Sequence, residues 1–328
     1  MNIKKESTGG GLRSLVGTRA FYKKVLLVAV PIMIQNGITN FVSLLDNIMV
    51  GQVGTEQMSG VAIANQLVFI FNLCIFGAVA GAGILGAQFY GSGNSEGVRD
   101  TFRFKLLFGV ILSAIFAVIF LTVGEPLIQQ FIHQGEGIGD LEATRSYGKA
   151  YLEVIVIGIL PFALTQCYSG TLRETGETVI PMIAGIIAVL VNLVFNYILI
   201  FGKLGLPALG GPGTGVATAI VYWVMFLTMV VYVCRHTYLR ELMTWRVWEI
   251  PVWATLKKLA GIGFPGALAM LFEVTLFAAV ALLIAPLGAI QVAGHQVALN
   301  FSSLLFMVPL SIGTAATIRT GFALGRKS

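Results

Sequence analysis

The sequence predicts an all-α integral membrane protein, on the grounds of its composition, its long apolar runs and the distribution of its charges. Hydrophobic residues make up 56% of the 328 residues and charged residues only 11%, where a soluble domain has roughly 25% charged residues. The mean hydropathy is +0.86. So many apolar side chains cannot be hidden in one aqueous core. The composition therefore excludes a soluble enzyme, a disordered chain and a nucleic-acid-binding protein.

Apolar runs long enough to cross a bilayer occur eight times, since a spanning helix needs about 20 apolar residues. None shows the alternation of barrel strands. A basic segment, 1–23, precedes the first run, which is too long for the apolar part of a cleavable signal peptide. In order, the predicted spans are 24–50, 58–88, 105–124, 148–172, 179–201, 214–234, 258–286 and 289–318. Pro31 lies inside the first span and Pro265 inside the seventh, and Pro181 helps to begin the fifth.

Positive charges alternate between the two sides of these spans. All 21 Lys and Arg residues except Arg145, Lys149 and Lys203 lie in the N-terminal segment, in every second connection or at the C-terminus. Cytoplasmic loops of membrane proteins carry such an excess. The pattern predicts that both termini are cytoplasmic, and that the net charge of +6 faces the membrane surface rather than a nucleic acid.

An internal repeat relates the beginning of the chain to its end. Sliding the sequence by 234 residues places Pro31 on Pro265 and Gly91 on Gly325. The two copies point the same way, which is a layout of transporters. We therefore expect a basic cytoplasmic N-terminus at 1–23 and a six-helix first lobe at 24–234. A basic cytoplasmic linker at 235–257 then leads to the first two helices of an incomplete second lobe at 258–328.

Two acidic residues, Asp46 and Glu273, lie well inside predicted spans. A charge there costs at least ~2.5 kcal/mol on insertion scales, so a functional role is the first hypothesis. Glu273 lies near the membrane midplane, and no Lys or Arg is expected within the spans to pair with it. It could hold a proton, Na⁺ or an organic cation in turn. A protonated, structural Glu273 and an interfacial Asp46 are the alternatives.

Polar residues that share a helix face extend this candidate site. Asn40 and Asp46 belong to a polar stripe on the first span, and Asn192 and Asn196 lie one turn apart on the fifth. Asn300 lies on a similar face of the last span. These side chains could coordinate a cation, or they could join helices by hydrogen bonds.

Pro31 and Pro265 are the candidate hinges, because proline bends helices and frees carbonyls near transport sites. Packing alone is the alternative. No nucleophile–base arrangement, phosphate-binding loop or metal cluster is recognisable in the sequence. We therefore expect no enzyme activity and no cofactor, and an ion gradient as the energy source.

Several of these segments resemble the multidrug and toxic compound extrusion (MATE) family. The first half, with Asp46-Asn47-Ile48-Met49-Val50-Gly51 and Asn192, is closer to the DinF-type branch. The second half, with Gly263-Phe264-Pro265, Phe272-Glu273-Val274 and Ala293-Gly294-His295-Gln296, is similar to the NorM-type branch. The resemblance covers eight of the family's twelve helices. It implies a six-helix N-lobe followed by the first two helices of a parallel C-lobe.

The resemblance implies a multidrug efflux antiporter of the bacterial inner membrane, which exports amphipathic organic cations in exchange for H⁺ or Na⁺. Glu273 matches an acid that binds the coupling cation in the NorM-type branch, and Asp46 matches one that serves ion coupling in the DinF-type branch. Na⁺ is the metal ion considered at Glu273. Asn196 stands where DinF-type proteins have an aspartate. A flippase of lipid-linked saccharides and a truncated membrane protein without transport activity are the alternatives. A second copy of the chain, or a separate segment with helices 9–12, could complete the structure.

Overall fold

The computed structural model describes residues 18–132, 140–243 and 289–327, together with isolated positions between 257 and 283. Within them the regular elements are all helices, as the composition predicts. Seven of these are long and apolar enough to cross a membrane. The helices are α1 (Arg19–Gly51), α2 (Thr55–Gly91), α3 (Ser95–Thr122), α4 (Gly124–Ile132), α5 (Leu141–Glu174), α6 (Val179–Phe201), α7 (Gly211–Arg235), α8 (Thr237–Leu242) and α10 (Ala289–Gly325).

The predicted spans 105–124 and 148–172 begin later than the helices that they match. Helix α3 begins ten residues earlier, where Asn94 accepts a hydrogen bond from the backbone amide of Gly97. Helix α5 begins where Asp140 caps its first turn. Such polar caps fix a helix end, whereas an apolar run marks only the part that suits hydrocarbon. The short helices α4 and α8 were not predicted, and most of the predicted span 258–286 lies outside the described residues.

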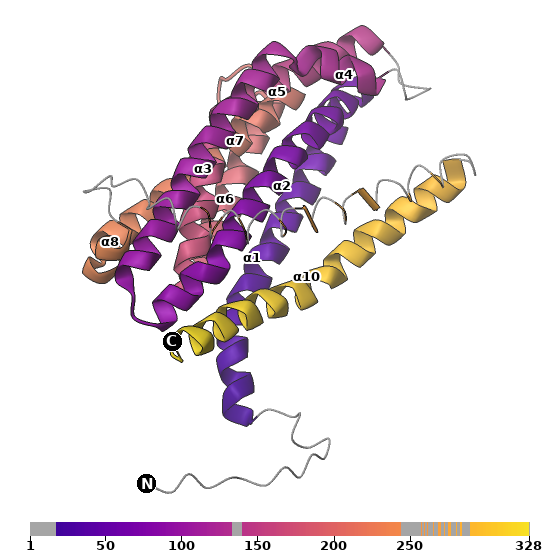
Figure 1. Cartoon of the computed structure of the whole chain (residues 1–328). Coiled ribbons are helices and arrows are strands. Elements are labelled where there is room, and N and C mark those ends of the chain that lie inside the picture. Colours follow the sequence, from indigo (N-terminus) through magenta and orange to yellow (C-terminus); the bar gives the residue numbers. More distant parts are fainter. Residues whose placement is uncertain are drawn as a thin grey trace, which may run out of the picture.

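Helix α5 forms the centre of the bundle, packed between α2, α3 and α7 (Figure 1). Helix α1 packs along α6, and α10 crosses α1 and α2 obliquely. One apolar cluster lies mainly between α2 and α5, around Phe71 and Ile155. A second lies between α3, α5, α7 and α8, where the rings of Phe102 and Tyr168 meet edge to face at 5.0 Å.

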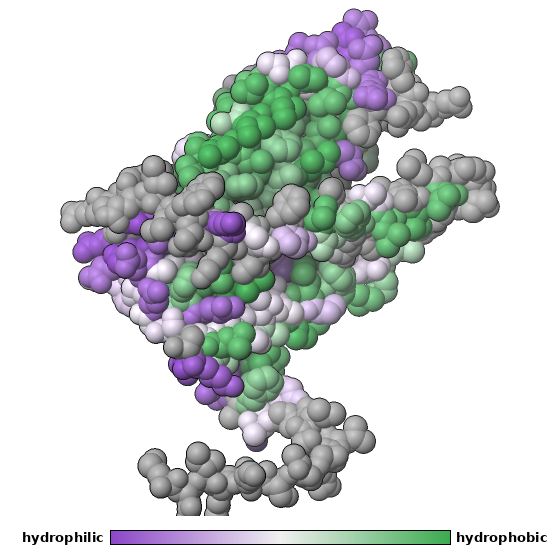
Figure 2. Space-filling view, viewed as in Figure 1, coloured by the Kyte–Doolittle hydropathy of each residue, from purple (hydrophilic) through white to green (hydrophobic). Residues whose placement is uncertain are grey.

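The outer surface of the bundle is apolar between two polar ends. Figure 2 shows a continuous apolar surface on the helices below α4, with hydrophilic side chains gathered near α4 and near α8. Large side chains such as Val118, Leu121 and Ile157 are at least 60% exposed. Burial against hydrocarbon rather than within the protein accounts for this surface, so the fold is that of a membrane protein.

The crossing of α2 and α10 is reciprocal. A Cβ atom on Gly91 would lie 2.6 Å from the carbonyl oxygen of Phe322, and one on Gly325 would collide with the carbonyl oxygen of Gln88. Gly325 and Phe322 are 234 residues after Gly91 and Gln88, which is the offset of the sequence repeat. The two helices therefore contact each other through the same positions of the repeat, as two copies do across a local twofold axis.

Pro31 lies inside α1, and the helix continues through it without a break from Arg19 to Gly51. Pro31 therefore lies within a continuous helix in the described conformation. A transmembrane helix tolerates proline because neighbouring groups compensate for the one lost hydrogen bond. The hinge role of Pro31 stays a prediction. Pro265, the other candidate hinge, is helical and exposed, but its neighbours lie outside the described residues.

Candidate functional site

Asp46 on α1 faces two asparagines on α6. The side-chain amide of Asn196 donates hydrogen bonds to Oδ1 of Asp46 at 2.5 Å and to Oδ1 of Asn192 at 3.0 Å. Both asparagines are at most 1% exposed. They lie one turn apart on the same face of α6, and α1 packs along that helix. The fold thus brings together three of the candidate residues, here called the Asp46 cluster.

Two polar atoms of the Asp46 cluster are buried and have no hydrogen-bond partner among the described residues. They are Nδ2 of Asn192 and Oδ1 of Asn196. A buried polar atom left unpaired costs about 1–3 kcal/mol, so such atoms are rare outside sites that take up water, an ion or a ligand. The cluster therefore has donor and acceptor capacity beyond its own internal hydrogen bonds.

The oxygen atoms of this cluster suit hard cations. Carboxylate and amide carbonyl oxygens are ligands that such cations prefer, and a carboxylate also accepts a proton or pairs with an organic ammonium group. Rotating the Asn196 amide by half a turn would exchange its nitrogen and oxygen, and would then present an oxygen beside Asp46. The cluster can therefore bind one positive species at a time.

Two tyrosines lie within electrostatic range of Asp46. The hydroxyl of Tyr151 on α5 donates to Oδ1 of Asn65 on α2 at 2.8 Å. Tyr222 on α7 packs against the ring of Phe162 at a centroid distance of 4.9 Å. Sequence reasoning missed both tyrosines, because aromatic residues are abundant in every span and nothing in the spacing separates these two.

The polar stripe of α1 does not act as one unit. Asn36 donates to the hydroxyl of Ser311 on α10 at 3.1 Å, and Asn40 donates to the backbone oxygen of Asn36 at 3.3 Å. Asn40 therefore bonds back to the backbone of its own helix and makes no described hydrogen bond to Asp46. The side chains of Glu273 and Asn300 lie outside the described residues, as does any Na⁺ site at Glu273.

A buried ion pair joins α3 to α5. Nζ of Lys105 lies 2.6 Å from both carboxylate oxygens of Glu174 and 3.2 Å from the hydroxyl of Thr171. The Lys105 side chain is fully buried, and Glu174 is 7% exposed. Gly83 and Gly86 of α2 leave room for the carboxylate, since a Cβ at either position would collide with it. Lys105, at the start of the predicted span 105–124, thus pairs with Glu174, whereas the expectation that Glu273 has no such partner concerns a residue outside the described ones.

Arg173, next to Glu174, points to another helix. Its Nη2 donates to Oε1 of Gln35 on α1 at 2.5 Å, and its Nε is buried without a partner among the described residues. Gln35 is 6% exposed. The sequence placed Arg173 in a cytoplasmic connection, and its charge alone gave no signal of this contact.

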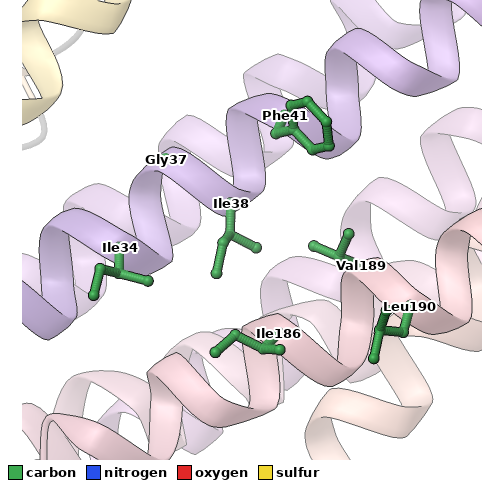
Figure 3. Close-up of a pocket in the computed structure, with 7 residues that line it drawn as sticks. All are labelled: Ile34, Gly37, Ile38, Phe41, Ile186, Val189 and Leu190. Carbon is green, nitrogen blue, oxygen red and sulfur yellow. The ribbon is translucent and has the colours of Figure 1, made fainter.

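An apolar groove runs between α1 and α6 (Figure 3). Its volume is about 390 Å³. Figure 3 shows the side chains of Ile34, Ile38 and Phe41 from α1 opposite Ile186, Val189 and Leu190 from α6. The residues that line the groove are apolar, so it suits lipid or a hydrophobic ligand surface.

Comparison with known proteins finds a family model named MatE that matches residues 31–198 and 265–328. Among curated proteins, the multidrug resistance protein MdtK of Edwardsiella ictaluri is 39% identical over 308 residues, which are 93% of this chain and 65% of that protein. The protein of the same name from Yersinia pseudotuberculosis is 38% identical over 306 residues, with the same coverage. The chain thus spans about 65% of the length of these relatives.

Solved structures share the fold. A crystal structure of a MATE protein in complex with MaD3S has a TM-score of 0.80 at 24% identity, and the match covers 93% of this chain and 66% of that one. An outward-facing multidrug resistance MATE family transporter of the MOP superfamily has a TM-score of 0.78 at 24% identity, with coverages of 93% and 65%. These likenesses establish the architecture of the helices.

Proposed function

This chain belongs to the MatE family, and from that premise we propose that it works as a multidrug efflux antiporter of the bacterial inner membrane. The observation that carries the proposal is the Asp46 cluster, a carboxylate beside two buried amides in an apolar bundle. The name of the curated relatives, multidrug resistance protein, supports the choice of substrate class. The expected substrates are amphipathic organic cations, and the coupling ion is H⁺ or Na⁺.

The proposed mechanism is a competition for the Asp46 carboxylate. An uncompensated charge inside a membrane helix costs several kcal/mol, so the cluster binds either an organic cation or the coupling ion. Uptake of H⁺ or Na⁺ removes the charge that retains the organic cation and thereby releases it. Asn196 stabilises the ionised carboxylate through its hydrogen bond, and Asn192 orients Asn196.

Glu273 is proposed as a second cation site on the other lobe, with Na⁺ or H⁺ as its ion. The two lobes then rock about the bound substrate, which is the transport mode of repeat-built transporters. Both termini are placed in the cytoplasm by the distribution of Lys and Arg. A second copy of the chain or a separate four-helix segment could complete the second lobe.

Transport by the 328-residue chain in proteoliposomes tests this function. Ethidium serves as the fluorescent organic cation, and proton and Na⁺ gradients are imposed one at a time. We expect gradient-driven ethidium movement that is lost in Asp46→Asn and in Glu273→Gln, with unchanged amounts of folded protein. The gradient that drives the movement identifies the coupling ion.

Two results would overturn the proposal. Ethidium movement that is equal in the wild type and in Asp46→Asn removes Asp46 from the mechanism. Absence of movement in a folded chain favours the non-transporting alternative, and co-expression of a four-helix complement then shows whether activity returns. Movement of a lipid-linked saccharide, instead of ethidium, favours the flippase alternative.

A further inference from the structure

Two described side-chain hydrogen bonds link helix α1 to other helices of the first lobe. One is the Asp46–Asn196 bond to α6, and the other is the Gln35–Arg173 bond to α5. Gln35 and Asp46 are 11 residues apart, which is about 20° from three full turns at 100° per residue. The two bonds therefore lie on one stripe of α1, roughly 16 Å apart along the helix axis.

The Gln35–Arg173 bond joins two helices that are not main packing partners of each other. Helix α1 packs mainly against α6 and α10, so Arg173 bridges to it from the last turn of α5. The neighbouring carboxylate of Glu174 already pairs with another cation, since both of its oxygens accept from Lys105 at 2.6 Å. The buried guanidinium of Arg173 thus donates specifically to a neutral amide, that of Gln35.

The position of Gln35 gives the bond a consequence for Asp46. Gln35 lies one turn after Pro31, and a proline removes one backbone hydrogen bond at its position in the helix. The bond to Arg173 fixes α1 between that weak point and the Asp46 cluster. Two bonds on one stripe, added to the packing of α1 against α6 and α10, resist rotation and sliding of the helix more than one bond does.

We propose that Arg173 and Gln35 are positioning residues, which hold α1 in the rotation and axial position that keep Asp46 opposite Asn196. Neither residue touches the transported cation in this account. The inference rests on the proposed function, because it explains how the Asp46 cluster is kept in its binding arrangement. Loss of the bond lowers the affinity of that cluster without removing any of its groups.

Ethidium binding to the full 328-residue chain in nanodiscs tests the inference in a double-mutant cycle. Asp46→Asn raises the ethidium Kd at least about tenfold, and Arg173→Met raises it about fivefold to tenfold. The double variant binds as Asp46→Asn does, within about twofold, because Arg173 acts only through Asp46. Multiplied effects in the double variant, or an unchanged Kd in Arg173→Met, would overturn the positioning role.

Further variants separate positioning from folding. Gln35→Leu removes the same bond from the α1 side and is expected to raise Kd as Arg173→Met does, even if one of the two variants fails to fold. Arg173→Lys and Gln35→Glu each keep a donor and an acceptor in place, so both bind ethidium within about threefold of the wild type. Weak binding in these conservative variants, with normal thermal unfolding, contradicts the inference.

The control is Arg103→Gln on α3, whose described salt bridge goes to Asp100 on the same helix. It removes a cation from another helix, so the Kd stays unchanged. The design also separates the two proposals. If Asp46→Asn binds ethidium normally, the proposed function fails; if only the double-mutant cycle is multiplicative, the function stands and the positioning role fails.

Discussion

The side-chain amide of Asn196 on α6 lies 2.5 Å from the carboxylate of Asp46 on α1, although 150 residues separate them in the sequence. This bond brings a donor from another helix to Asp46. It joins two helices that carry the groups most suited to bind a cation. Loss of this hydrogen bond is therefore expected to weaken cation binding at Asp46.

Asn196→Leu removes the donor to Asp46 while keeping a side chain of similar size. A hydrogen bond to a charged group contributes about 1.5–3 kcal/mol, so we expect ethidium efflux in proteoliposomes to fall at least about tenfold. Val194→Ala, on an exposed part of the same helix, is the control and should leave efflux unchanged. Efflux in Asn196→Leu that equals the control contradicts a role of this amide.

The Lys105–Glu174 pair should behave as a buried ion pair in stability measurements. Lys105→Met leaves the Glu174 carboxylate without its cation and should lower the free energy of unfolding by about 3–5 kcal/mol. Lys105→Met combined with Glu174→Leu should recover most of this loss, because no unpaired charge remains. Unfolding by heat or denaturant in detergent checks both. A double variant that is less stable than the single one contradicts the account.

The helices themselves were largely predictable, because a run of about 20 apolar residues has few alternatives in a membrane. Their ends were not. Helices α3 and α5 extend past their apolar runs to the polar caps Asn94 and Asp140. For the same reason Lys105 was placed at the edge of a span, although α3 carries it into the protein interior.

The candidate site was predictable in part. The one-turn spacing of Asn192 and Asn196 and the depth of Asp46 pointed to a shared polar region, and the fold brings these three together. The pairing of Lys105 with Glu174 was not predictable, because 69 residues separate them and each resembled a loop charge. Helix rotation and packing decide such contacts, and a single sequence does not encode them in its spacing.

The reciprocal crossing of α2 and α10 predicts a difference between two glycines of α10. Gly325→Ala places a methyl group against the backbone of Gln88 and should destabilise the protein by about 1–3 kcal/mol. Gly313→Ala has open space and should be neutral or stabilising by up to about 1 kcal/mol, because alanine favours helices. Thermal unfolding of the two variants side by side checks this. Equal effects would show that the crossing is loose.

Acid should weaken the contact between α4 and the start of α5. The hydrogen bond from Lys149 to Glu125, at 2.8 Å, holds the pKa of Glu125 below its ordinary value, with help from the charges of Lys149 and Arg145. A lowered pKa in the folded state contributes stability above the unfolded pKa of about 4.3, and this contribution is lost as the pH falls through the folded value.

Glu125→Gln should therefore lower Tm slightly at pH 7, because the pair is exposed and such pairs contribute little. The difference in Tm between this variant and the wild type should shrink as the pH falls from about 5 to about 3. Thermal scans over that range measure it. A Tm difference that does not depend on pH contradicts the assignment of the lowered pKa to this contact.

Ion release on ligand binding tests the central proposal most directly. Ethidium is added to the full chain in weakly buffered nanodiscs, first with a pH indicator and then after loading with radioactive Na⁺. The account predicts that ethidium displaces H⁺ or Na⁺ from the wild type, and that Asp46→Asn shows no displacement from the first lobe. Ethidium binding without release of either ion, or equal release from Asp46→Asn and the wild type, would contradict an exchange of cations at Asp46.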